Sequence, residues 1–351
     1  MKAAKSSGFV HVYRYLTTVA LRIYFGKIEV VGLENIPKDK PFILATNHQN
    51  AFLDPHLAGS FCPKPGLHFL TRGDIFNKRT TPLLRLLNMI PIYRIRDGIG
   101  SLGKNEETFE ICAEIFRQKN AVLIFSEANH GEHHYLRPIK KGTSRLAFHG
   151  QSEMDEELVV IPCGLNYFSH LMPRRKAIVV FGEPIPVREY LNDFNESEAK
   201  GLNNLKTRIA EGMKECLVIP EKTDDYAQKA QEIFSRKNES RTFTELRKQA
   251  EGDFSQIELK EKTQSTIRKA LIFLFSLPNF LPLLLLSKFL SGIKDKVFWA
   301  SFKYAFMIFV APMWWLILVL VSGAFGMWQL GGLLALASAI SFFVRAELRK
   351  T

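Results

Sequence analysis

The chain has 351 residues, 46% of them hydrophobic and 23% charged, and its formal net charge is +12 at pH 7. This length allows one sizeable α/β core plus an appendage. The positive charge fits a protein held against anionic membrane lipids. We expect no nucleic-acid partner, because the basic residues are dispersed among acidic ones and no helix-turn-helix, zinc-finger or aromatic RNA-binding signature is present.

Cysteine and histidine spacing does not point to a metal. The four cysteines lack CxxC or other ligand spacing and are expected to be reduced thiols. His130, His133 and His134 lie close together in the sequence, but they do not form the HExxH pattern of a zinc helix. The sequence therefore predicts no metal site and no bound cofactor.

The first 190 residues divide into a helix and an α/β domain. Residues 1–27 are predicted to form an interfacial amphipathic helix, since Phe9 to Phe25 mixes apolar and aromatic side chains with Arg14 and Arg22. Over residues 28–190, short apolar stretches alternate with helical patterns, which predicts an α/β domain whose mixed sheet is covered by helices. The helical candidate is Ser101 to Arg117, and the strand candidates are Ile28–Val31, Pro41–Ala45, Leu67–Leu70, Ile90–Tyr93, Ala121–Phe125, Leu158–Cys163 and Ala177–Phe181.

His48 and Asp54 follow the strand that ends at Ala45. A carboxylate bonded to one imidazole nitrogen fixes the tautomer, so that the other nitrogen can accept a proton near neutral pH. A regular helix would turn the two side chains apart, so the segment must bend if they are to pair. The alternative is an ordinary polar pair in a loop.

Two further clusters contain groups suited to binding a phosphorylated substrate. Arg94 follows the strand candidate that ends at Tyr93, and a planar guanidinium binds phosphate bidentately; the alternative is a surface charge. Glu127 follows the strand that ends at Phe125, where ligands of α/β sheets gather, and Lys140 follows it along the chain. Alternatively, Glu127 caps a helix and Lys140 is solvated.

The sequence changes in character after residue 190. Residues 191–265 are rich in Glu, Lys, Gln and Arg, which predicts a charged helical arm. Residues 266–351 form the predicted membrane region, with transmembrane helices at 304–321 and 325–344 joined by Ser322 to Ala324 as a helical hairpin. The apolar run 270–287 contains Pro278 and Pro282, so we expect a re-entrant or interfacial segment.

Flanking charges set the expected orientation. Lysines precede the hairpin and Arg345, Arg349 and Lys350 follow it, while its turn carries no charge. Both ends should then be cytoplasmic, which predicts an integral protein of the cell membrane with its α/β domain on the cytoplasmic face. The alternative is that 270–287 is a third full span with the domain on the other side.

These blocks and their order, from residue 28 to 187, resemble the glycerolipid acyltransferase family (PlsC-like domain), which includes lysophosphatidate and glycerol-3-phosphate acyltransferases. The Asn-His block is similar to Asn47-His48 with Asp54, the Arg block to Pro91–Asp97, and Phe-Pro-Glu-Gly to Phe125–Ala128; the Val-Pro-Val block is similar to Val160–Gly164. Five residues instead of the usual four separate His48 from Asp54. Ser126 and Ala128 replace Pro and Gly, and no Arg closely follows Glu127.

The resemblance implies acyl transfer from acyl-coenzyme A or acyl carrier protein to a hydroxyl of a glycerol-phosphate or lysolipid acceptor in phospholipid biosynthesis. It implies that His48 is the general base and Asp54 orients it, while Arg94, Glu127 and Lys140 bind the acceptor phosphate. The alternatives are an acyltransferase for another lysolipid or an aminolipid, a hydrolase that uses the same base with water, and an inactive lipid-binding scaffold.

Overall fold

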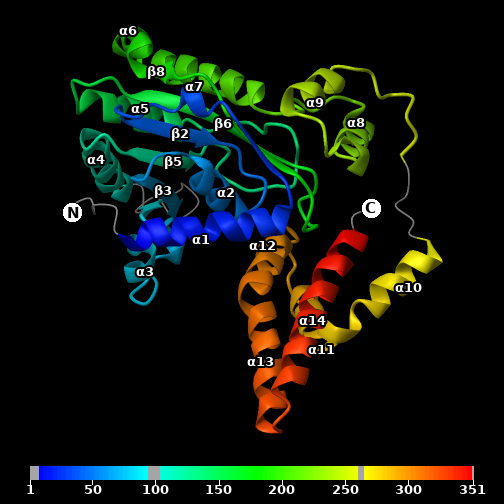
Figure 1. Ribbon diagram of the computed structural model, residues 1–351. Helices are drawn as coiled ribbons and strands as arrows, with labels where there is room; N and C mark the ends of the chain where they lie inside the picture. Colours follow the sequence, from blue (N-terminus) through cyan, green and yellow to red (C-terminus); the bar gives the residue numbers. More distant parts are fainter. Residues whose placement is uncertain (1–7, 94–102, 260–264, 350–351) are drawn as a thin grey trace.

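The structure is a computed structural model, and it describes residues 8–93, 103–259 and 265–349. An α/β body carries a helix along its lower edge, and a pair of long helices projects from the same side (Figure 1). The predicted combination of a mixed sheet, covering helices, an N-terminal helix and a C-terminal apolar hairpin is confirmed.

The body is built around one mixed sheet with the strand order β1-β7-β6-β2-β5-β3-β4, and β8 pairs with β6. Strands β2 to β6 run parallel to their neighbours among themselves, whereas β7 and β8 are antiparallel to β6. The seven predicted strands are all present, and the short β8 was missed. Their bounds are β1 Ile28–Val31, β2 Phe42–Thr46, β3 Leu67–Arg72, β4 Met89–Ile92, β5 Ala121–Phe125, β6 Val159–Tyr167, β7 Ala177–Phe181 and β8 Ile185–Pro186.

Helices cover both faces of this sheet. Alternate residues of β2 point to opposite sides, so Phe42 and Leu44 pack with helices α1 and α2, while Ile43 and Ala45 pack with α4, α5 and α7 (Glu198–Glu215). The helices of the body are α1 Gly8–Phe25, α2 Leu53–Phe61, α3 Thr81–Leu86, α4 Lys104–Arg117 and α5 Gly142–Ser152, with short 3-10 turns at Leu33–Asn35, Gly73–Ile75 and Val187–Tyr190.

The segment 191–265 is less solvent-facing than its composition indicates. Its helix α7 buries Leu202, Leu205 and Ile209 in the core on one face of the sheet. A third apolar cluster joins its later helices to the outer strands through Phe234 and Leu246. This segment is therefore packed onto the body over much of its length. Its elements are α6 Leu191–Glu196, α7 Glu198–Glu215, α8 Tyr226–Ile233, a 3-10 turn at Arg236–Asn238 and α9 Phe243–Ala250.

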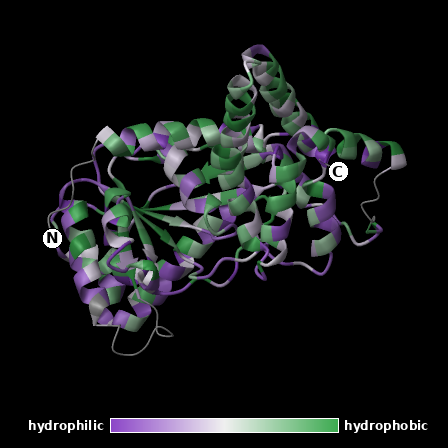
Figure 2. Ribbon diagram, turned by 90° about the horizontal axis from the view of Figure 1, so that it is seen from below, coloured by the Kyte–Doolittle hydropathy of each residue, from purple (hydrophilic) through white to green (hydrophobic). Residues whose placement is uncertain are grey.

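Two apolar helical segments are long enough to cross a membrane, Val297–Ala324 and Trp328–Leu348. The first starts before the predicted boundary at 304, and the hairpin turn lies at Phe325–Met327, where Gly326 adopts a φ of 75° that favours glycine. Both helices are predominantly hydrophobic (Figure 2). The segments are α12 Val297–Ala305, a π-helical turn at Phe306–Val310, α13 Ala311–Ala324 and α14 Trp328–Leu348.

The preceding apolar run is bent. Helix α10 (Thr266–Leu274) and the segment Leu277–Ser291, which contains a 3-10 turn at Leu277–Asn279 and α11 (Phe280–Ser291), meet at 47°. The bend falls next to Pro278, which cannot donate a helix hydrogen bond. This shape fits either a re-entrant segment or a broken span, so the predicted re-entrant path stays a prediction.

Helix α1 has an exposed apolar side. Leu21 and Tyr24 are buried against the body, whereas Val12, Leu16 and Val19 are 40–59% exposed. The carboxyl end of the helix lies at the upper end of the projecting hairpin, beside α12 (Figure 1). This geometry fits the predicted interfacial helix.

Candidate active site

His48 and Asp54 meet at the carboxyl end of β2. The Nδ1 atom of His48 lies 2.7 Å from Oδ2 of Asp54, whose side chain is fully buried. The His48 ring stacks on Phe125 with a centroid distance of 3.9 Å. No described residue hydrogen-bonds Nε2 of His48, and 14% of its side chain is exposed. The ring is thus held through Nδ1 while Nε2 is left to act on a substrate.

The segment between the two residues bends as the pairing requires. Residues 47–52 are not helical, and α2 begins at Leu53, so Asp54 lies in its first turn. The Asp54 carboxylate accepts the backbone N–H of Asn50 at 2.7 Å, which folds the loop back over the helix start. A carboxylate in the first turn is also favoured by the helix dipole.

Tyr167 is a third member of this group that the sequence reasoning missed. Its hydroxyl donates to Oδ1 of Asp54 at 2.6 Å and is completely buried. Burial, and then the neighbouring Asp54 carboxylate, raise the pKa of Tyr167, so the phenol stays a donor. Three donors therefore converge on Asp54. The strand predicted to end at Cys163 continues to Tyr167 in the structure. This continuation of the strand was the signal that could have pointed to Tyr167.

Glu127 organises the loops around His48. Its Oε2 accepts the backbone N–H of His48 at 2.7 Å, and its Oε1 accepts the backbone N–H of Arg137 at 2.7 Å. The Arg137 guanidinium donates to the same carboxylate at 2.8 Å and to the backbone oxygens of His48, His130 and Asn129. Both carboxylate oxygens are thus occupied by protein donors, and the Glu127 side chain is almost fully buried.

Arg137 was missed as a site residue because it lies ten positions after Glu127. The sequence shows no arginine immediately after Glu127, but the intervening loop folds back and brings Arg137 to the carboxylate. The hydrogen bonds of Arg137 to three carbonyl groups tie together the loops that follow β2 and β5. Arg137 is therefore a positioning residue for the loop of His48.

The two departures from the Phe-Pro-Glu-Gly pattern have local explanations. The backbone N–H of Ser126 donates to the carbonyl of Thr46 at 3.0 Å, a bond that proline cannot make. Its hydroxyl lies 3.0 Å from that of Thr143. Ala128 adopts a φ of 63°, the left-handed conformation in which glycine has no steric cost.

The structure says less about the predicted phosphate-binding residues Arg94 and Lys140. Arg94 lies outside the described residues, but it follows Tyr93 at the end of β4, and β4 runs in the same direction as β2. Lys140 is exposed, and its backbone N–H donates to the carbonyl of Ser126 at 2.9 Å. The structure thus brings His48, Asp54 and Glu127 together and puts Lys140 near their sheet edge.

The start of α12 contacts the loops that carry the His48–Asp54 pair. His130, whose ring centroid is 5.6 Å from that of His48, bonds through Nε2 to Asp295 at 3.0 Å. The Ser301 hydroxyl accepts the backbone N–H of Phe52 at 3.2 Å. The first turns of the apolar helix Val297–Ala324 therefore lie directly beside the loops that carry His48 and Asp54.

A buried polar group lies behind the loop. Nε2 of His170 bonds to Oε1 of Gln49 at 2.9 Å, and its carbonyl accepts Nδ2 of Asn50 at 3.0 Å. Burial lowers the pKa of His170 to about 4, with a smaller contribution from His133, so the imidazole is neutral at pH 7. Its neighbour His134, 4.5 Å away between ring centroids, has its pKa lowered by the same cause.

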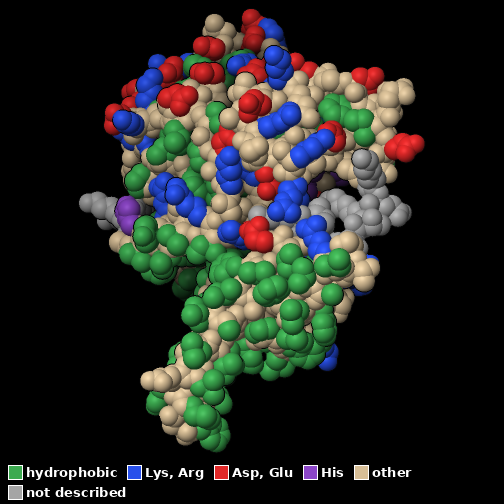
Figure 3. All heavy atoms as spheres, turned by 45° about the vertical axis from the view of Figure 1, so that its right-hand side comes forward, with side chains coloured by type: hydrophobic (Ala, Val, Ile, Leu, Met, Phe, Trp, Pro, Cys, Tyr) green, Lys and Arg blue, Asp and Glu red, His purple; other side chains and the backbone are tan. Residues whose placement is uncertain are grey.

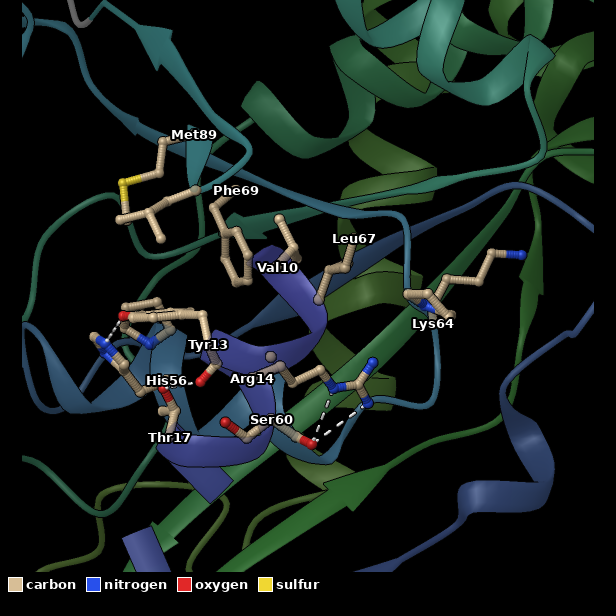
Figure 4. A pocket seen from close by; sticks show the side chains of 14 residues that line it. Val10, Tyr13, Arg14, Thr17, His56, Ser60, Lys64, Leu67, Phe69 and Met89 are labelled. Carbon is tan, nitrogen blue, oxygen red and sulfur yellow. Dashed lines mark hydrogen bonds between the residues drawn. The ribbon is translucent and has the colours of Figure 1, made fainter. Parts of the chain in front are cut away.

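A small apolar slot of about 70 Å³ lies between α1, α2 and the strands β3 and β4 (Figure 4). Figure 4 shows Val10, Phe69 and Met89 around it, with Tyr13 and His56 on one side. The Tyr13 hydroxyl bonds to Nε2 of His56 at 2.8 Å. Because His56 and Asp54 belong to the same helix, the slot lies beside the helix that orients His48.

The four cysteines are all buried and unpaired with one another. Burial raises the pKa of Cys62 and Cys216 to about 12 and raises that of Cys112 and Cys163 as well. Thiols that stay protonated are poor nucleophiles. The local chemistry therefore favours a general base over a covalent cysteine intermediate.

Comparison with known proteins places this site in a family. The Acyltransferase family pattern matches residues 27–166, which include His48, Asp54 and Glu127. Glycerol-3-phosphate O-acyltransferase 2 of Saccharomyces cerevisiae is 29% identical over 124 residues, 35% of this chain and 16% of the yeast protein. Glycerol-3-phosphate O-acyltransferase 1 of the same yeast is 28% identical over 109 residues, 30% of this chain and 14% of that protein.

The chain thus matches less than a fifth of the length of these two relatives. Among solved structures, the 1-acyl-sn-glycerophosphate acyltransferase of Thermotoga maritima is similar at 19% identity and a TM-score of 0.41, covering 59% of this chain and 87% of that one. The predicted family and enzyme class are confirmed for the domain. Residues 27–166 of this chain form an acyltransferase domain.

Proposed function

We propose that this protein is a membrane-bound O-acyltransferase that moves a fatty acyl group from an acyl thioester to a hydroxyl of a glycerol-phosphate acceptor. The observation that carries the proposal is the 2.7 Å contact between His48 Nδ1 and Asp54 within the acyltransferase domain. The donor is acyl-coenzyme A or acyl carrier protein, and the acceptor is glycerol-3-phosphate or 1-acylglycerol-3-phosphate. The reaction serves phospholipid biosynthesis.

His48 acts as the general base in this mechanism. Its Nδ1–H donates to Asp54, so Nε2 carries the lone pair that takes the proton from the acceptor hydroxyl. The oxygen attacks the thioester carbonyl, and the carbon–sulfur bond of the tetrahedral intermediate breaks. The imidazolium returns its proton to the departing thiolate, which leaves as a thiol. Asp54 stabilises the imidazolium formed in between.

The acceptor phosphate is assigned to the sheet edge beyond β5 and β4. Strand spacing of ~4.8 Å puts β4 about 14 Å from β2 along the order β2-β5-β3-β4. Arg94 is the residue after Tyr93 in the sequence and lies outside the described residues, and Lys140 lies beside the end of β5. We assign phosphate binding to these two cations, with Glu127 shaping the site through Arg137 and the backbone of His48.

The apolar elements suit a lipid product. Part of the acyl chain is assigned to the slot of Figure 4, because the slot lies between the interfacial helix α1 and the helix that carries Asp54. Phe298 of α12 packs edge-on against His130, with ring centroids 5.2 Å apart, so a membrane helix borders the catalytic loops. The reaction then takes place where the bilayer meets water. By the distribution of Lys and Arg around the hairpin, this side is cytoplasmic.

The proposal is tested by acyl transfer with the detergent-purified protein. Labelled acyl-coenzyme A is supplied with glycerol-3-phosphate and, in parallel, with 1-acylglycerol-3-phosphate, and the lipid product is identified. Transfer to either acceptor supports the proposal and names the step. Release of free fatty acid with both acceptors, lost in His48→Ala, would identify a hydrolase. No turnover with coenzyme A or carrier-protein donors would favour an inactive lipid-binding scaffold.

A further inference from the structure

A second and larger cavity lies outside the matched acyltransferase region, where the membrane helices meet the body. Its volume is about 600 Å³, and helices α10, α11, α12 and α14 form most of its wall. The body contributes Tyr24 of α1 and the loop residues Met172 to Arg174. We call it the basic cavity, because five of its lining side chains are cations, namely Arg174, Lys269, Lys303, Arg345 and Arg349.

The positive charge of the basic cavity is only partly balanced. Among the residues that the structure describes, no Asp or Glu lines it. Arg174 pairs with Glu347 at 2.8 Å just outside the lining. Within the described ranges 8–93, 103–259 and 265–349, the other four cations have no carboxylate within 4.0 Å. Four cations close together in a partly buried space attract an anion.

Two of these cations are half-buried and are held in place by neutral groups. Lys303 Nζ donates to the carbonyl of Leu171 at 2.8 Å, and Nε of Arg345 donates to the hydroxyl of Ser276 at 2.8 Å. These bonds fix the side chains without a directly paired carboxylate, and the nearest acidic influence on Lys303 comes from Glu132 outside the lining. A half-buried cation next to a bilayer is stabilised when a phosphate group replaces the lost water.

The rest of the basic cavity is apolar. Its lining includes Leu283, Leu286 and Leu290 of α11 together with Phe306 and Phe342. The cationic carboxyl end of α14 lies next to the body, and the hairpin runs from there to a distant tip (Figure 1). Lys and Arg side chains gather along the border between the polar body and the apolar helices (Figure 3). Charge therefore lies at the interface, and apolar surface lies on the membrane side.

We propose that the basic cavity binds one anionic phospholipid of the surrounding bilayer. Its phosphate lies among Lys303, Arg345 and Arg349, and its acyl chains lie along the leucines of α11. This site is distinct from the His48 site, since α12 uses Phe298 and Ser301 toward the catalytic loops and Trp299 and Lys303 toward the cavity. A lipid bound there contacts the helix that adjoins the catalytic loops.

The test is photocrosslinking of the full chain in phosphatidylcholine nanodiscs that contain a diazirine-labelled phosphatidylglycerol. We expect labelled peptides from α11 and the end of α14, competed by unlabelled phosphatidylglycerol and not by phosphatidylcholine. Arg345→Gln with Arg349→Gln should weaken this labelling roughly 30-fold, from the contribution of each interfacial cation. The matched control removes two exposed lysines outside the lining, Lys288→Gln with Lys294→Gln, and should leave the labelling unchanged.

A second pair of substitutions keeps the test valid if the first variant fails to fold. Lys269→Gln with Lys303→Gln removes two other lining cations, and a monodisperse gel-filtration profile shows that each variant is folded. Labelling that spreads evenly over the exposed faces of α13 and α14, or that falls equally in the control pair, overturns the proposal. Displacement of the probe by excess inorganic phosphate would also overturn it, because a small-anion site would then suffice.

Discussion

Replacing Arg137 by lysine keeps the positive charge but removes the planar fork that ties the catalytic loops together. In the structure, the guanidinium donates to Glu127 at 2.8 Å and to the carbonyls of His48 and His130 at 3.1 and 3.4 Å, as well as to Asn129. A lysine ammonium cannot reach these acceptors in the same geometry. The substitution thus separates positioning from charge.

The expected cost follows from the bonds that are lost. Lysine can retain one bond to Glu127, so two or three bonds to carbonyl groups, each contributing about 1 kcal/mol, disappear. We expect Arg137→Lys to lower the free energy of unfolding by about 2 kcal/mol. Arg137→Met also leaves the buried Glu127 carboxylate without a cation and should cost about 3 kcal/mol or more. Arg145→Lys, at an exposed position of α5, is the matched control.

Steady-state kinetics with the acceptor varied distinguish the two roles of Arg137. If it positions the loop of His48, kcat of Arg137→Lys falls about 10-fold or more while KM for the acceptor stays near the wild-type value. Chemical denaturation in detergent gives the stability change on the same preparation. Unchanged stability together with a raised KM would refute the reasoning and assign Arg137 to the acceptor phosphate.

Three further substitutions test separate features of the site. Tyr167→Phe removes a donor at 2.6 Å from the buried Asp54 and should lower the free energy of unfolding by ~2 kcal/mol, measured by denaturation; no loss would mean that the bond is absent. Ala128→Gly removes the steric cost of the φ of 63° and should raise the free energy of unfolding by ~1 kcal/mol. A lower free energy of unfolding would mean that the conformation is not strained. Because burial lowers the pKa of His170 to about 4, its contribution to stability is complete above about pH 6.5 and is lost as pH falls toward 4, on the order of 3 kcal/mol. Denaturation from pH 7.5 to 4.5 should show this extra loss in the wild type relative to His170→Gln, and parallel curves would contradict it.

The strands and the His48–Asp54 pair could be predicted because their signals are local. β1, β5 and β7 occupy the predicted residues, and each consists of consecutive apolar side chains. His48 comes directly after such a strand. The sequence showed that the segment must bend if Asp54 is to reach His48, but it could not show how. The bend depends on the bond from the Asn50 N–H to the Asp54 carboxylate.

Contacts between segments that are distant in the sequence could not be predicted from it. Tyr167 reaches Asp54 only because β6 lies next to β2 in the sheet, and Arg137 reaches Glu127 only because the nine-residue loop between them folds back. The charged composition of α7 suggested a solvent-facing helix, but Leu205 and Ile209 on one side of α7 are buried in the core. The basic cavity likewise gathers cations from four separate segments, so no single stretch of sequence indicates it.

The central claim is that His48 is the base of an acyl transfer, and turnover of His48→Ala tests it most directly. The purified variant is compared with wild type and with His149→Ala, which changes a histidine on α5 away from the site. We expect kcat for acyl transfer to fall at least ~100-fold in a His48→Ala protein that still folds, and we expect His149→Ala to be fully active. A folded His48→Ala protein that transfers acyl groups at a near-normal rate would contradict the account.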